Sequence, residues 1–238
     1  MISPETPETS AESLVSEPVL SRWDGWMSKA LIGVFVLVYF YQIWFNYQAV
    51  GFGLRFDKID TRVMYVLGAN FPQAFAQGEY WRVFTSCFLH LDALHLLMNS
   101  MALHYFGPML ERSFGPRKLL LAFVLTGVAG SLATTLMHLN TPYLSAGASG
   151  GLYGLFGVIF VTGKRYAEFM PPAFQTWLNQ TLGMLVIFSF LPFIDMWGHF
   201  GGLLAGMLLG LFYRPLPPEP FPDEERPDER PDETMLRE

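Results

Sequence analysis

A serine within a glycine-rich run is the residue of this chain from which a chemical function can best be argued. Ser149 lies in the run GASGGLYG (147–154), which opens an apolar stretch. Its glycine neighbours leave the backbone open, and the free N–H groups of a helix start would point at a bound group. The hydroxyl could attack a carbonyl while main-chain donors hold the resulting oxyanion. The same run also suits close packing of a membrane helix, so both interpretations remain open.

A histidine at the head of the last apolar stretch is the natural partner for this hydroxyl. His199 lies in GHFGGLLAGMLLG, where glycines recur every four residues from Gly198 to Gly210 through Gly202 and Gly206. This spacing lays a groove along one helix face, into which a neighbouring helix can pack. Imidazole at membrane depth is costly and points to function. The alternative is that His199 only caps its helix or binds a loop.

The run around Ser149 has a small face of its own, because Gly147 and Gly150 are each followed by a glycine four residues later. If the two glycine faces meet, the Ser149 hydroxyl and the His199 imidazole come together. Such a contact is the minimum requirement for general-base activation of a hydroxyl.

Two further polar residues lie four apart and therefore project from one helix face. His95 and Asn99 both offer N–H donors, which suits stabilisation of an oxyanion beside the serine. Asn99 could instead make an interhelical hydrogen bond. His90 faces elsewhere and is interpreted as a structural donor. Only Asp92 accompanies these histidines as a carboxylate, so we expect no metal and no other cofactor.

The composition is that of a membrane protein. Hydrophobic residues make up 51% of the 238 residues and charged residues 15%, well below the ~25% of soluble domains. The net charge of −6 comes from residues 217–238, with nine acidic residues against three arginines. The sequence has no stripe of basic residues, so we expect no nucleic acid as a partner. The single cysteine, Cys87, excludes an intramolecular disulfide.

Apolar runs of nearly bilayer-spanning length predict an all-α membrane protein with six transmembrane helices. We expect these spans at 27–45, 83–106, 118–138, 149–162, 177–193 and 199–213. A long connection at about 46–83 is rich in aromatic residues and suits the membrane interface. The membrane domain is expected at 25–214. Residues 1–24 and the acidic, proline-rich 215–238 are expected to be disordered tails.

The positions of lysine and arginine predict that both termini are cytoplasmic. Basic residues fall on alternate connections and are absent from the short turns at 139–148 and 194–198. Only the long first loop breaks this pattern, and long loops count weakly in the rule. Ser149 and His199 each precede a basic residue by 15 positions, or about 22 Å of helix. His95 and Asn99, counted back from Arg112, come to about 25 and 20 Å. Four polar residues from three spans therefore share one depth.

This combination resembles the rhomboid family of intramembrane serine proteases, over about residues 25–214. The matching patterns are GASGGLYG, His199-Phe200-Gly201-Gly202 with Gly206, HLDALHLLMN with His90, His95 and Asn99, Trp81-Arg82, and Glu111-Arg112 with Gly115. Each piece alone is weak evidence, but together and in this order they are specific to the family.

The resemblance implies a Ser–His dyad rather than a triad. Ser149 would attack the scissile carbonyl, and His199 would take its proton and pass it to the leaving amine. His95, Asn99 and the Ser149 N–H would form the oxyanion hole, and Tyr153 would pack against the imidazole. The family uses no acid at the position of Asp195, so we leave it out of the catalytic set.

The resemblance also implies how the domain is supported and what it cleaves. Trp81 and Arg82 would anchor the first loop, and Glu111 and Arg112 would help to fix the second inner turn. Substrates would be transmembrane proteins that enter sideways from the lipid and unwind before attack. With no organelle-targeting segment before the first span, we expect a bacterial cytoplasmic membrane.

Two other classes of function remain. One is a non-catalytic rhomboid-like protein that binds membrane clients; such relatives lack the serine or the histidine, and both are present here. The other is a small transporter, for which we would expect internal repeats and interrupted helices.

Overall fold

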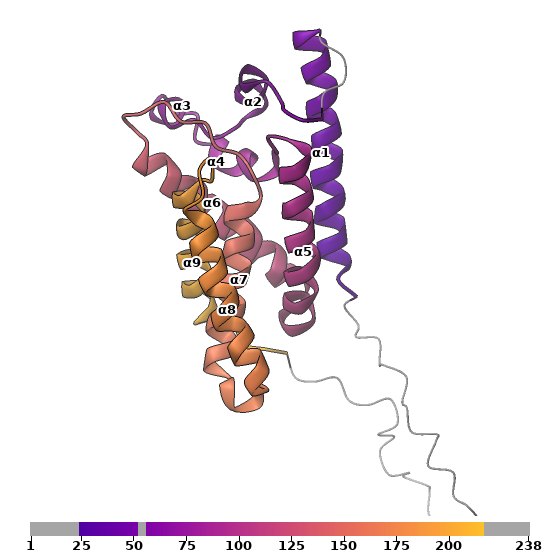
Figure 1. The fold of residues 1–238 in the computed structure, drawn as a ribbon, viewed down its shortest axis with the longest axis vertical. Helices are drawn as coiled ribbons and strands as arrows, with labels where there is room; N and C mark the ends of the chain where they lie inside the picture. Colours follow the sequence, from indigo (N-terminus) through magenta and orange to yellow (C-terminus); the bar gives the residue numbers. More distant parts are fainter. Residues whose placement is uncertain (1–23, 52–55, 217–238) are drawn as a thin grey trace, which may run out of the picture. The chain divides into compact units, whose positions relative to one another are not determined.

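The computed structural model describes residues 24–51 and 56–216, and helices dominate them (Figure 1). The segments are α1 (Trp26–Val50), α2 (Thr61–Leu67), α3 (Pro72–Ala76), α4 (Arg82–Thr85), the 3-10 turn η1 (Ser86–Phe88), α5 (Ala93–Phe114), α6 (Pro116–Met137), α7 (Ser149–Arg165), the 3-10 turn η2 (Ala167–Phe169), α8 (Pro172–Ser189) and α9 (Met196–Gly210). All belong to one unit, Trp23–Leu216. The predicted tails lie almost entirely outside the described residues.

Six of the described helices are at least 15 residues long, namely α1 and α5 to α9. Two of these, α1 and α6, have both the length and the apolar composition to cross a membrane. The six-span arrangement therefore remains a prediction. No named strand occurs in the described ranges, where the one isolated β-bridge pairs Asn70 with Ser145.

The second predicted span, 83–106, was misplaced by about ten residues at its start. Residues 82–88 form α4 and η1, and α5 begins only at Ala93. The cause is Asp92, whose carboxylate caps the helix by accepting the His95 backbone N–H at 2.8 Å. At the other end the chain turns at Gly115, whose φ of 86° favours glycine.

The first connection is predicted as one long loop beginning at about residue 46. In the structure α1 continues to Val50, and the connection after it contains three short helices, α2 to α4. Arg82 ties this segment together from a buried position. Its guanidinium donates to the carbonyl oxygens of Tyr65 (2.6 Å) and Ala69 (3.2 Å) and pairs with Glu79 at 2.6 Å. These charge-assisted bonds satisfy carbonyls left over at the end of α2.

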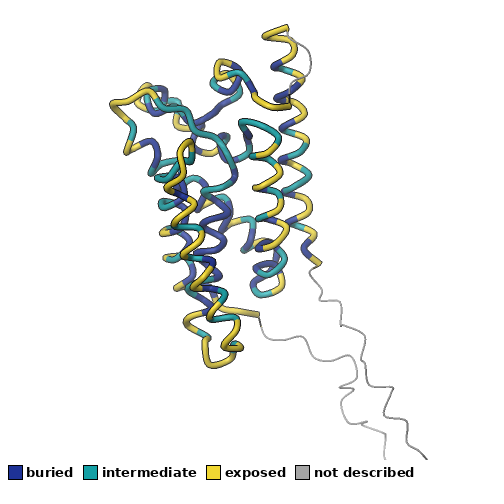
Figure 2. Tube along the Cα trace, viewed as in Figure 1, coloured by how far each residue is buried: buried dark blue, intermediate teal, exposed yellow. Residues whose placement is uncertain are grey.

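Glycine contacts between α7 and α9 form the tightest packing in the fold. A Cβ added at Gly202 would overlap the backbone of Gly150, and one at Gly206 would overlap the backbone of Gly154. The two backbones touch because neither residue carries a side chain, which is the close approach that small residues permit between membrane helices. Helix α6 packs against both, and buried residues run along most of α7 (Figure 2).

A buried carboxylate joins α5 to the start of α1. Glu111 accepts hydrogen bonds from the backbone N–H groups of Met27 (3.0 Å) and Ser28 (3.2 Å) and from the Ser28 hydroxyl (3.0 Å). Gly25 gives α1 no side-chain cap, so Glu111 supplies one from another helix, where negative charge is favourable. Glu111 thus holds the start of α1, and Arg112 is exposed. The expected role of these two residues in fixing the inner turn stays a prediction.

Candidate active site

Three helices present their N-terminal ends to one region. Ser149 is the first residue of α7, His95 lies in the first turn of α5, and His199 lies in the first turn of α9. A Cβ placed on Gly147 would lie 2.7 Å from His95 Nε2, and one on Gly150 would lie 3.2 Å from the Gly198 carbonyl oxygen. Each helix start carries roughly half a positive charge, so the region favours an anion.

The segment that leads into Ser149 is held in an extended course by its neighbours. The Gly147 N–H donates to the Ser86 carbonyl oxygen at 2.9 Å, and the backbones of Asn70 and Ser145 bond in both directions at 2.8 and 3.0 Å. Gly147 has a φ of 142°, which disfavours a side chain. Ser149 is half-buried, and Ala148 offers its helix no side-chain cap. The first N–H groups of α7 therefore remain free for a ligand.

The imidazole of His199 is buried and held on two sides. Its ring stacks on Tyr153, with centroids 3.9 Å apart and an interplanar angle of 19°, and its Nδ1 lies 3.2 Å from the Ser189 hydroxyl. Among the described residues no hydrogen bond joins Ser149 to His199, although their helices touch through Gly150 and Gly202. Catalytic hydrogen bonds often shorten only when substrate is bound, so the dyad remains a prediction.

Asn99 and His95 converge on the segment before Ser149. Asn99 is 5% exposed, and its Nδ2 has no hydrogen-bond partner among the described residues. A Cβ on Gly147 would lie 3.6 Å from this nitrogen. A buried donor without a partner costs about 1–3 kcal/mol, so the amide is suited to an acceptor supplied from outside. The interhelical hydrogen bond that we considered for Asn99 is not made by Nδ2.

The expectation that His90 acts as a structural donor is wrong for its ring. Its two ring nitrogens are buried and have no partner within the described ranges. The ring packs against Phe35 and His95, at centroid distances of 5.4 and 5.2 Å. The backbone of His90 makes the structural contact instead, because its N–H and carbonyl both bond to the Gln42 side chain.

Asp195 links three segments rather than joining His199 as a catalytic acid. Its carboxylate caps α9 by accepting the Gly198 N–H at 3.0 Å, and it also accepts from the hydroxyls of Thr134 on α6 and Ser145. The carboxylate thus holds α9, α6 and the 139–148 segment together.

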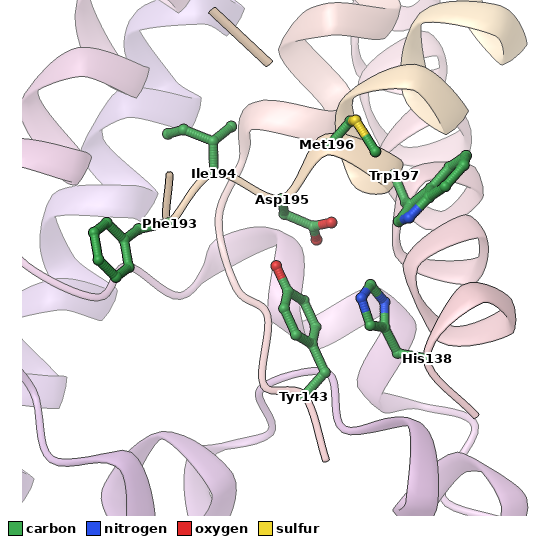
Figure 3. Close-up of a pocket in the computed structure, with 7 residues that line it drawn as sticks. All are labelled: His138, Tyr143, Phe193, Ile194, Asp195, Met196 and Trp197. Atoms are coloured by element: carbon green, nitrogen blue, oxygen red, sulfur yellow. The ribbon is translucent and has the colours of Figure 1, made fainter. Parts of the chain in front are cut away.

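A cavity of about 380 Å³ opens beside this carboxylate (Figure 3). The rings of His138 and Tyr143 stack there, with centroids 4.0 Å apart, and Figure 3 shows both of them next to Asp195. Burial, with a smaller contribution from the charge of Asp195, raises the pKa of the Tyr143 phenol to about 12. The phenol therefore stays neutral at physiological pH.

Sequence reasoning missed the residues that hold the site from outside its motifs. Asn70 is fully buried, donates to the Ser131 carbonyl oxygen at 2.9 Å and accepts from Thr135 at 3.0 Å. With its bridge to Ser145, it joins the first connection to α6 and to the segment before Ser149. Ser189, which contacts His199, was missed too. Single polar residues with distant partners leave no periodic pattern by which to find them.

A family model described as the Rhomboid domain matches residues 77–216, which is more than half of the chain and includes every predicted catalytic residue. The chain belongs to the rhomboid family. It is therefore a membrane-embedded protein of a family that includes proteases acting on membrane proteins. The matched region begins within the first connection and ends just after α9.

Relatives of this rhomboid carry names of both active and inactive proteins. YdcA of Bacillus subtilis (strain 168), named as a candidate rhomboid protease, is 35% identical over 63% of this chain and 72% of its own length. Rhomboid protease GluP of the same organism is 32% identical over 62% of this chain but only 29% of its own length. Inactive RHOMBOID-like protein 8 of Arabidopsis thaliana is 27% identical over 68% of this chain and 46% of its own.

Proposed function

We propose that this rhomboid is an intramembrane serine endopeptidase that works through a Ser149–His199 dyad. The observation that carries the proposal is that three groups lie near the N-termini of three helices: a serine, a stacked histidine, and an amide donor that has no partner among the described residues.

In the proposed reaction, Ser149 Oγ attacks the scissile carbonyl carbon while His199 Nε2 takes its proton. The tetrahedral oxyanion accepts hydrogen bonds from Asn99 Nδ2, the His95 ring and the Ser149 backbone N–H, near the positive ends of three helices. The imidazolium then passes its proton to the leaving amine. In the second half of the reaction, water attacks the carbonyl carbon of the acyl-enzyme, His199 takes a proton from the water, and the bond to Ser149 Oγ breaks to release the acid product.

The substrates we propose are transmembrane segments that enter from the lipid. Backbone carbonyls of an intact helix are engaged in hydrogen bonds, so a substrate must unwind locally before Ser149 can attack it.

The large exposed apolar side chains of α8, among them Met184 and Ile187, suit a helix in contact with lipid. We infer that both termini are cytoplasmic, because Lys164 and Arg165 close α7 at the end opposite Ser149.

The second candidate function is binding of membrane clients without cleavage. One observation favours this candidate: a relative that is 27% identical to this chain is named as an inactive rhomboid-like protein. In that case the exposed apolar helix faces would bind the client proteins, and Ser149 would have no chemical role. Retention of both Ser149 and His199 favours the protease.

The experiment that tests the proposal is cleavage in reconstituted vesicles. The purified protein is placed in proteoliposomes with a single-span substrate that has a small residue at the cut site and a helix-destabilising segment beyond it. We expect two products from one cut within the span, and covalent labelling of the resting enzyme by a fluorophosphonate. Stable binding of the substrate without cleavage or labelling would instead support the client-binding function.

Replacing Asn99 by alanine is expected to lower turnover about tenfold to a thousandfold while leaving the KM close to that of the wild type. The amide stabilises charge that exists only in the transition state, so its removal affects the chemical step. The assay is cleavage of the same substrate in vesicles. Wild-type turnover in Asn99→Ala would remove Asn99 from the oxyanion hole.

A further inference from the structure

Ser189, the last residue of α8, contacts His199 at the ring nitrogen Nδ1. Its side chain is 1% exposed, and its Oγ lies 3.2 Å from His199 Nδ1 and 3.2 Å from the Tyr153 hydroxyl oxygen. The same Oγ lies 2.8 Å from the carbonyl oxygen of Leu185, one turn earlier in α8. Ser189 thus stands where a serine protease triad has its acid.

The direction of the hydrogen bonds follows from counting protons. A serine hydroxyl has one proton to donate and two lone pairs. Ser189 Oγ could donate this proton to the Leu185 carbonyl oxygen, 2.8 Å away, or to the Tyr153 hydroxyl, 3.2 Å away. We assign it to the carbonyl, which is nearer and can only accept. Tyr153 also donates to this carbonyl oxygen, at 3.0 Å. Ser189 Oγ is then left as an acceptor for a proton on His199 Nδ1.

The same bond from a hydroxyl to the carbonyl one turn earlier recurs at other buried positions in the helices of this chain. Thr126 donates to Ala122, and Thr162 donates to Val158, both at 2.7 Å. The bond from Ser189 to Leu185 at 2.8 Å is therefore a local geometry that the packed helices of this protein accommodate.

We propose that Ser189 is a positioning residue that holds His199 as the Nδ1–H tautomer and so leaves Nε2 free as the base. This inference rests on the proposed protease function and extends it to a residue outside the family motifs matched above. Stacking on Tyr153 sets the plane of the ring, and the Ser189 acceptor sets its rotation within that plane. Together they fix which nitrogen faces Ser149.

The proton path is complete with these groups. Nε2 receives the Ser149 proton when the Oγ–C bond forms and the carbonyl π bond opens, and it later gives that proton to the leaving amine as the C–N bond breaks. Nδ1 keeps its proton throughout and donates it to Ser189 Oγ. A neutral hydroxyl thereby replaces the carboxylate of a triad, while the nearby Asp195 is committed to Gly198, Thr134 and Ser145.

The test is the tautomer of His199 in the resting protein. The full-length enzyme is labelled with ¹⁵N-histidine, and the His199 signals are assigned by their loss in a His199→Gln variant. At a pH where the ring is neutral, the protonated and bare ring nitrogens have distinct ¹⁵N shifts, because they are chemically different sites. We expect the wild type to carry its proton on Nδ1. A proton on Nε2 would overturn the proposal without any variant.

Variants separate positioning from a merely structural role. Ser189→Ala is expected to give a mixture of tautomers and a roughly tenfold loss of turnover with an unchanged KM, the scale of one neutral hydrogen bond. Ser189→Thr keeps the hydroxyl and should restore the Nδ1–H tautomer and most of the turnover. The matched control is Thr181→Ala, another buried hydroxyl on α8, which should leave both readouts unchanged.

The tautomer measurement needs no turnover, so its failure differs from failure of the proposed function. A resting protein with Nδ1–H in the wild type and a mixture in Ser189→Ala, but without cleavage, would sink the protease and keep the positioning role. Normal cleavage with an Nδ1–H tautomer that survives in Ser189→Ala would leave the protease intact and overturn the role of Ser189.

Discussion

Replacing Ser149 by alanine is expected to reduce cleavage of a transmembrane substrate by about 10⁴-fold or more, to the level of the assay background. The oxyanion donors would remain, but no acyl-enzyme could form, and losing the nucleophile of a serine protease has an effect of this size. His199→Ala should cause a comparable loss, because a serine hydroxyl without its base is a poor nucleophile at neutral pH. The double variant should be no worse than either single variant, because the two residues act as one unit.

The measurement is the initial rate of product formation in proteoliposomes, with fluorophosphonate labelling of Ser149 as a second readout. A matched control is Ser113→Ala, which removes a serine hydroxyl from the last turn of α5, the end of that helix opposite His95. This control should cleave at the wild-type rate. Undiminished cleavage by the Ser149→Ala enzyme would contradict the assignment of the nucleophile, and thermal unfolding must show that each inactive variant remains folded.

Replacing Gly206 by alanine is expected to destabilise the bundle by about 3 kcal/mol, the upper end of the cost of overpacking. The added Cβ would overlap the backbone of Gly154, and a backbone cannot move aside as a flexible side chain can. Helices α7 and α9 would separate, and Ser149 and His199 with them. We expect the apparent Tm to fall by roughly 10 °C and cleavage to be lost at temperatures where the wild type is active.

The chain supplies its own control for this substitution. Gly183 on α8 is also helical, but nothing lies within 4 Å of a Cβ built on it. Gly183→Ala should therefore be neutral or stabilise by up to about 1 kcal/mol, the helix propensity of alanine over glycine. Equal effects of the two substitutions on thermal unfolding would show that the contact between α7 and α9 is not as close as we describe.

Sequence patterns predicted the parts of this fold that local chemistry determines. The third predicted span, 118–138, matches α6, which begins at Pro116, and α7 begins at Ser149 as expected. Proline, glycine and the apolar periods mark such boundaries from nearby residues alone. The glycine repeat of α9 predicted a close neighbour, and that neighbour is α7. The proposed roles of Ser149 and His199 still await the experiments above.

The features that sequence reasoning missed depend on partners far away in the chain. Glu111 caps a helix that begins 85 residues earlier at Trp26, and Asn70 bonds to residues more than 60 positions away. No local period encodes such pairs. The start of α5 was missed for another reason. Its cap, Asp92, lies inside an apolar run that by hydropathy alone continues without interruption from α4.

Among the described helices α9 is the last to be synthesised, which has a consequence for the newly made protein. Ser149 leaves the ribosome 50 residues before His199, and at 5–20 residues per second this is a gap of about 2.5–10 s. Asp195, which joins α6 and the 139–148 segment to α9, arrives with the same last helix. On the proposed mechanism, the nascent chain would therefore hold Ser149 without His199 during this interval. Synthesis order alone would then keep the proposed protease inactive until α9 has been made.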